Sequence, residues 1–109
     1  MSARLSLEVI AFAPCHRATL RGFVSVVIEE WRLRINDLTI HEQSRSRWVG
    51  MPARPLLDAN GIVIRNERGK VSYFPVLAFT DAEARNGFGR RIIEELLIFA
   101  AAAFEREDA

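Results

Sequence analysis

Apolar and polar residues alternate with a period of two over most of the first half of the chain. Leu5, Leu7 and Val9 are separated by mostly polar positions, which predicts a first strand that fades at Pro14. The next segment, 20–29, is rich in Val and Ile and predicts a well-buried second strand. Because the connections between these segments are too short for helical crossovers, we expect an antiparallel meander.

The alternation changes phase in the third segment. Apolar residues occupy odd positions up to Ile35 and even positions from Leu38 onward. One extra residue of this kind indicates a β-bulge, and Asn36-Asp37 has suitable chemistry for it. A polar turn over 42–46 then leads to a fourth strand over 47–51.

Glycine and proline interrupt the pattern where the fourth strand ends, in the run Arg47-Trp48-Val49-Gly50-Met51-Pro52-Ala53-Arg54-Pro55. Trp48, like Phe74 and Phe79, is expected to pack in the core, and stacking on bases is the alternative for these three aromatics. Gly50 permits a close backbone approach. Pro52 has no N–H to give to a sheet, so the strand must stop or lie at an edge.

The segment that follows contains residues typical of short strands and turns. Asn60-Gly61 is a turn signal, and a short strand is expected over 62–64. Residues 65–70 predict a charged hairpin loop. A further strand is expected over 71–79, confined to an edge or a bulge by Pro75.

An amphipathic helix is predicted at the end of the chain. Thr80-Asp81-Ala82-Glu83 resembles an N-cap followed by a capping-box glutamate. Gly87 and Gly89 indicate either a kink or the close approach of another chain or a ligand. Apolar residues recur at helical spacing on one face: Phe88, Ile92, Leu96, Phe99, Ala100 and Ala103.

This apolar face is wider than one small sheet needs, because Ile93, Leu97 and Phe104 extend it. An exposed patch of that size would be a liability on a monomer. We therefore expect part of the face to form a subunit interface. The interface residues expected are Phe88, Ile92, Leu96 and Phe99.

Together these patterns predict one α+β domain over 1–109. Its sheet is expected to be a meander of about five to six antiparallel strands, followed by the C-terminal helix, in a dimer.

Composition narrows the possible functions. Half of the residues are hydrophobic, which excludes disorder, and no apolar run approaches the roughly 20 residues of a membrane span. The N-terminus lacks a secretory apolar core, which predicts a cytoplasmic location. Cys15 is the only cysteine, so we interpret Cys15-His16 as ordinary strand-end or loop residues.

The sequence contains no catalytic constellation. Gly87-Phe88-Gly89 lacks the third glycine and the preceding strand of a phosphate-binding loop, and Asp37 and His41 lie about 13 Å apart on an extended strand. We therefore expect no enzyme activity, cofactor, metal or small-molecule substrate, and no membrane partner.

Charge is distributed unevenly although the net charge is only +1. Residues 45–80 carry six basic side chains and two acids, a net +4, whereas residues 81–109 carry four basic side chains and seven acids, a net −3. Fourteen of the fifteen basic residues are Arg, whose planar fork suits phosphate. A genomic base-composition bias would produce the same preference for Arg.

Several short motifs agree in order and spacing with a known family. The run Ile35-Asn36-Asp37-Leu38-Thr39-Ile40 followed by Trp48-Val49-Gly50-Met51-Pro52-Ala53 resembles the centre of the bacterial stage V sporulation protein G family of septation regulators. Phe74-Pro75-Val76 and Gly89-Arg90-Arg91-Ile92 resemble its later proline step and helix start. The resemblance covers roughly residues 20–100.

The resemblance implies a small α+β homodimer that binds DNA, or in some members RNA, through basic residues near the C-terminal helix. The first candidate patch lies on the helix and a second surrounds the strand end and the hairpin. The nucleic-acid-binding residues expected are Arg85, Arg90, Arg91, Arg47, Arg54, Arg65, Arg68 and Lys70.

Two interpretations of these arginines remain open. They contact phosphate, or they form a solvated face in which Arg90 and Arg91 pair with Glu94 and Glu95. The alternative function is a dimeric protein-interaction module with the same fold and no nucleic-acid binding, favoured by the acidic tail 105–108.

Overall fold

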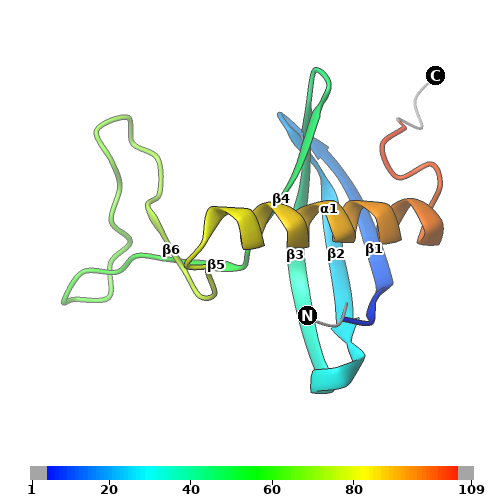
Figure 1. Cartoon of the computed structure of the whole chain (residues 1–109). Coiled ribbons are helices and arrows are strands. Elements are labelled where there is room, and N and C mark those ends of the chain that lie inside the picture. The colour runs from blue at the N-terminus through cyan, green and yellow to red at the C-terminus, as the bar shows by residue number, and fades with distance from the viewer. Residues whose placement is uncertain (1–4, 106–109) are drawn as a thin grey trace.

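The computed structural model describes residues 5–105, which form a four-stranded sheet, a separate two-stranded sheet and one C-terminal helix (Figure 1). The strands of the larger sheet are antiparallel and neighbour one another in chain order. They are β1 (Leu7–Arg17), β2 (Leu20–Ile28), β3 (Leu33–Gln43) and β4 (Ser46–Gly50). A short 3₁₀ helix, η1 (Glu29–Trp31), joins β2 to β3.

The α+β class is confirmed, but the single sheet of five to six strands is wrong. β5 (Ala53–Pro55) and β6 (Tyr73–Pro75) pair only with each other. The strand expected over 71–79 is therefore much shorter, and the one expected over 62–64 is reduced to isolated bridges. Of the predicted acidic tail 105–108, residues 106–108 lie outside the described part.

The first strand does not fade at Pro14. β1 continues to Arg17, and Pro14 lies opposite Gly22 of β2. This is possible because β1 is an edge strand, where a proline interrupts no ladder on its outer side. The chain then turns at Ala18, whose φ is +52°.

The predicted bulge in the third segment is confirmed. Val26 lies opposite Ile35 and Val24 opposite Leu38, so Asn36 and Asp37 together face one residue of β2. Asp37 adopts a φ of +60°, which an aspartate tolerates better than most residues. The bulge keeps Ile35 and Leu38 on the same, buried face of the sheet.

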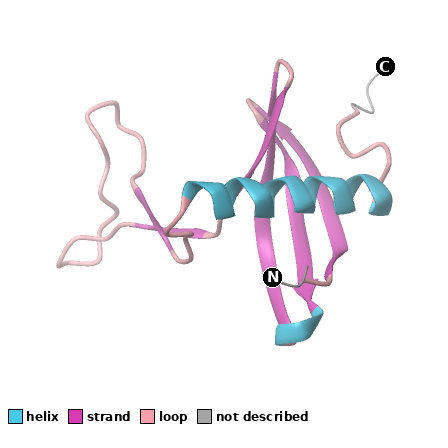
Figure 2. Cartoon of the chain, viewed as in Figure 1, coloured by secondary structure: helices cyan, strands magenta, loops and turns pink. Residues whose placement is uncertain are grey.

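The helix α1 (Ala82–Phe99) lies across one face of the sheet and closes the core (Figures 1 and 2). Its residues Ile92 and Leu96 are fully buried against that face. The rest of the core is Ala103, from the segment after the helix, and sheet residues from β1, β2 and β3: Leu7, Val9, Val24, Val26, Ile28, Ile35, Leu38 and Ile40.

The helix begins one residue later than the capping pattern predicts. Asp81, not Thr80, is the N-cap, and its carboxylate accepts a hydrogen bond from the N–H of Ala84 at 2.9 Å. Gly87 and Gly89 do not break the helix. A Cβ at Gly89 would lie 3.9 Å from Val49 of β4, which is an ordinary contact distance.

Residues 52–80, here called the arm, extend away from the four-stranded sheet (Figure 1). The Cα radius of gyration is 15.6 Å, compared with about 13 Å for a compact domain of this size. Within the arm, Gly61 and Gly69 have φ near +78° and form the predicted turns. The arm leaves the sheet at Pro52, directly after β4.

Gly50, at the end of β4, allows the close approach of a neighbouring strand that the sequence predicted. It lies opposite Thr39 of β3, and a Cβ at this position would overlap the Thr39 hydroxyl oxygen. We expect Gly50→Ala to lower the free energy of unfolding by about 1–3 kcal/mol, because the side chain of Thr39 would have to move. Urea unfolding measures this difference.

Gly87→Ala is the matched control. A Cβ there would meet only the tip of the flexible Arg90 side chain, at 3.9 Å. Alanine should stabilise this helical position by about 0.5–1 kcal/mol. Equal effects of the two substitutions would contradict the close-approach explanation.

Candidate nucleic-acid interface

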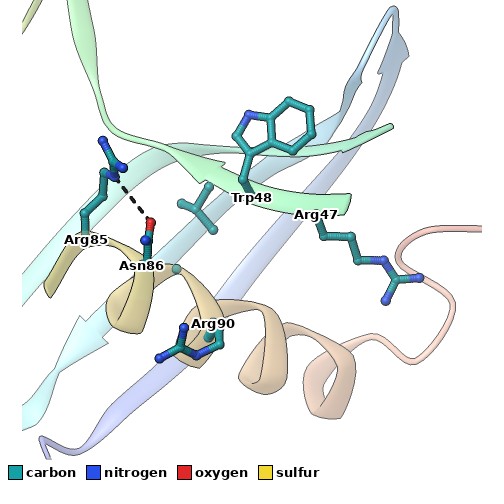
Figure 3. A pocket seen from close by; sticks show the side chains of 7 residues that line it. Arg47, Trp48, Arg85, Asn86 and Arg90 are labelled. Atoms are coloured by element: carbon teal, nitrogen blue, oxygen red, sulfur yellow. Dashed lines mark hydrogen bonds between the residues drawn. The ribbon is translucent and has the colours of Figure 1, made fainter. Parts of the chain in front are cut away.

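An open cleft of about 640 Å³ lies between β4 and the first half of α1. Arg85, Asn86 and Arg90 enter it from the helix, and Arg47 and Trp48 border it from the strand (Figure 3). Val49 and Gly89 also line it, and a Cβ on Gly89 would lie 3.9 Å from Val49. Among the described residues that line this cleft, none is acidic.

Two of these arginines have no carboxylate partner among the described residues. The only polar contact of the Arg85 side chain there is a weak one, from Nε to the Asn86 side-chain oxygen at 3.4 Å. Arg90 makes no ion pair with residues 5–105 and is exposed at the cleft. Both guanidinium groups are therefore available to an external anion.

Arg47 is more constrained. Its Nε donates a hydrogen bond to Glu42 at 2.9 Å, and its guanidinium carbon lies 3.9 Å from the centre of the Phe104 ring. Figure 3 shows its side chain directed away from Arg85 and Arg90. The three charged ends thus diverge, and the cleft presents a broad positive surface, not a clamp for one phosphate.

Arg91 has a structural position. Its Nη1 donates to the carbonyl of Leu5 at 2.8 Å, and its Nε lies 3.5 Å from a carboxylate oxygen of Glu95. The i,i+4 pairing foreseen for Arg91 and Glu95 is thus present. This side chain joins the helix to the start of the sheet, and it does not line the cleft.

Of the second predicted patch, Arg47 lines the cleft from β4, whereas the members on the arm are not brought into the cleft. Arg54 lies over the ring of Phe74, 5.3 Å from its centre, and Arg65 donates to the carbonyl of Gly69 at 2.9 Å. The remaining members of this patch, Arg68 and Lys70, are exposed in the same hairpin loop.

The helix N-terminus is poorly suited to an anion. Asp81 already occupies the N-cap and accepts the hydrogen bond of Ala84. Glu83 adds a second negative charge in the first turn. Phosphate contact would therefore depend on the side chains of Arg85 and Arg90, one and two turns further along.

The four residues predicted at a subunit interface do not share one surface. Ile92 and Leu96 are buried in the core of a single chain and are not available to a second subunit in this conformation. Phe88 packs against Phe79, with ring centres 5.1 Å apart. Phe99 is exposed, as is its neighbour Ile98, which is 78% exposed and was not among the predicted residues.

The expectation that the large aromatics are core residues is wrong. Trp48 is 40% exposed, Phe74 50% and Phe79 37%. Trp48 points to the opposite side of β4 from Val49 and stacks on His41 of β3, with ring centres 5.4 Å apart and planes within 6°. One face of the indole is thus supported by the protein.

Asn86 lines the cleft and was not among the residues predicted from the sequence. It follows Arg85 directly, and it precedes Arg90 by four positions, which places both on one side of the helix. The spacing of Asn86, Gly89 and Arg90 was the available signal, since it marks a polar and open stripe opposite the apolar face.

His41 is held between two hydroxyl groups. Its Nδ1 lies 2.9 Å from the Thr19 oxygen, and its Nε2 lies 3.0 Å from the Thr39 oxygen. Burial lowers the pKa of His41 below its ordinary value of 6.5, and the positive charge of Arg21 lowers it further.

No family model, curated protein or solved structure matches this chain. The resemblance to the stage V sporulation protein G family therefore remains a prediction from short motifs. Within residues 5–105, no three His, Cys, Asp or Glu side chains could together hold a metal ion. No helix in the same range could cross a membrane.

The lowered pKa of His41 predicts a dependence of stability on pH. Above pH 6.5 the imidazole is neutral in both the folded and the unfolded chain. As the pH falls below 6.5, the unfolded chain takes up a proton before the folded chain does, so stability declines. Urea unfolding at about pH 7.5 and about pH 5.5 measures this decline.

His41→Gln is the matched variant, because glutamine keeps hydrogen-bonding capacity without titrating. It should lose less stability than the unmodified chain between these two pH values. An identical decline in both proteins would show that His41 does not contribute.

Proposed function

We propose that the chain is a small homodimeric DNA- or RNA-binding regulatory protein of the stage V sporulation protein G type. The observation that carries the proposal is the cleft between β4 and α1. Arg85 and Arg90, which have no carboxylate partner among the described residues, line it from the helix, and none of its described lining residues is acidic. Trp48 borders it from β4, with its indole on the other side of that strand from Val49.

The arrangement of charge favours a polyanion over a small phosphate compound. Guanidinium groups that diverge cannot converge on one phosphate, but they can contact successive phosphates along a strand (Figure 3). Arginine suits such contacts because its fork donates two hydrogen bonds at once.

Trp48 adds a second kind of contact. His41 covers one face of its indole, and the ring is 40% exposed. A supported aromatic ring beside a positive surface can stack on an unpaired base. This favours single-stranded nucleic acid, or a duplex that is locally opened, as a ligand that contacts both the cleft and the Trp48 side of β4.

The first test removes the two unpaired arginines. We expect Arg85→Ala/Arg90→Ala to weaken binding to a short duplex DNA and to a single-stranded RNA. The slope of log K against log salt should fall by about one for each arginine. Fluorescence anisotropy over a salt series measures both quantities.

Arg17→Ala/Arg45→Ala is the matched control, because it removes two exposed positive charges outside the cleft. It should leave affinity and slope nearly unchanged. Equal losses in the two double variants would overturn the assignment to this cleft. Failure of the unmodified protein to bind any nucleic acid at low salt would overturn the function itself.

A protein-interaction module without nucleic-acid binding is the second candidate. The arm favours it, because most of the exposed large apolar side chains of the described chain lie there. A stable protein complex that survives nuclease treatment, together with no binding in the anisotropy experiment, would support this candidate over the first.

A further inference from the structure

No residue of the arm, residues 52–80, is buried. Thirteen large apolar side chains are exposed in the described part of the chain, and eight of them lie on the arm. These eight are Leu57, Ile62, Ile64, Tyr73, Phe74, Val76, Leu77 and Phe79. Exposed large apolar side chains concentrated on one segment are typical of a surface that meets a partner.

The arm is held in shape mainly by its own backbone. Leu56, Ile64 and Ser72 form a ring of hydrogen bonds: Leu56 N–H to Ser72, Ile64 N–H to Leu56 and Ser72 N–H to Ile64, each 2.8–2.9 Å. Ordering a residue costs about 1–2 kcal/mol in backbone entropy, and a two-stranded ribbon alone is marginally stable. An apolar cover would offset that cost.

The main body of the same chain has an uncovered region of its own. β4 pairs with β3 only over 39–43, so the first half of β3 has no strand on that side among the described residues. Trp31 and Leu33, beside this open edge, are both exposed. A strand edge of this kind readily accepts a segment from another chain.

We propose that two copies of the chain exchange arms. The arm of each copy packs its apolar residues on Trp31, Leu33 and the open half of β3 in the other copy. This inference rests on the homodimer in the proposed function, but it does not depend on nucleic-acid binding.

The geometry of one chain points to a second copy as the occupant. Figure 1 shows the arm extending away from η1 and the start of β3, so it does not cover them in its own chain. Each chain thus carries both an arm that needs a cover and an edge that needs a partner. A two-fold axis would place each arm on the open edge of β3 in the other copy. Both arms and both edges would then be covered in a closed dimer.

The charges of the two surfaces are also complementary. The arm carries four basic side chains and two acids, a net charge of +2. Residues 29–37, which include Trp31 and Leu33, carry three acids and two arginines, a net charge of −1. Attraction of this kind guides two surfaces into one register.

The oligomeric state tests the proposal. Sedimentation equilibrium should show a dimer for the unmodified chain and a monomer for both Ile62→Asp/Val76→Asp on the arm and Trp31→Asp on the body. Each substituted side chain is exposed in the single chain, so the fold should persist. Circular dichroism and urea unfolding verify that it does.

Ile98→Asp is the matched control, because Ile98 is exposed on α1, outside the proposed contact. It should remain dimeric. A monomeric unmodified chain would overturn the proposal. So would a dimer that dissociates on Ile98→Asp and persists in the arm and body variants.

Cross-linking between different copies tests the contact directly. In a Cys15→Ser background, one preparation carries Tyr73→Cys on the arm and the other Arg34→Cys on β3. Mixing them under oxidising conditions should give far more disulfide-linked dimer than either preparation gives alone.

A dimer without a mixed cross-link would show that the copies meet elsewhere, and it would overturn the arm exchange. Loss of nucleic-acid binding with cross-linking intact would overturn only the proposed function. The two failures can therefore be told apart.

Discussion

The burial of Ile92 and Leu96 against the inner face of the sheet is the interaction on which the rest of this structure depends. The helix is the only described element on that face, and burying each such side chain contributes about 1.5–3 kcal/mol. Their position also fixes the rotation of the helix. With these two residues turned inward, Arg85, Asn86 and Arg90 are left along the border with β4, where they line the cleft.

Local chemistry made the sheet and the helix predictable. The bulge at Asn36-Asp37 followed from a phase change in the apolar pattern, because a strand has only two faces and an extra residue exchanges them. The number of strands in the main sheet could not be predicted in the same way. Segments 53–55 and 73–75 have strand-like residues, but whether they join the main sheet depends on the direction in which the chain leaves Pro52, and no local pattern encodes that direction.

The sequence predicted the residue types of the candidate site, but it did not fully predict which residues line the cleft. Arg90 and Arg91 are adjacent in sequence and chemically identical, yet Arg91 bonds to Leu5 and Glu95 while Arg90 lines the cleft. A rotation of about 100° along the helix separates these positions. The partner of Arg91 lies 86 positions away, so only the tertiary structure shows it. The prediction that Trp48 lies in the core was wrong because His41, its cross-strand neighbour on β3, offers a polar ring on which the indole stacks.

The bond between Arg91 and the carbonyl of Leu5 also bears on the order of assembly. It joins residues 86 positions apart, so on the ribosome it cannot form until the chain from Leu5 to Arg91 has emerged. The hairpins of the sheet are local and can close earlier, since short loops close quickly. During that interval the face that will receive the helix is a bare apolar surface. The nascent protein should therefore be most prone to aggregate, and most dependent on chaperones, while the sheet has emerged and the helix has not.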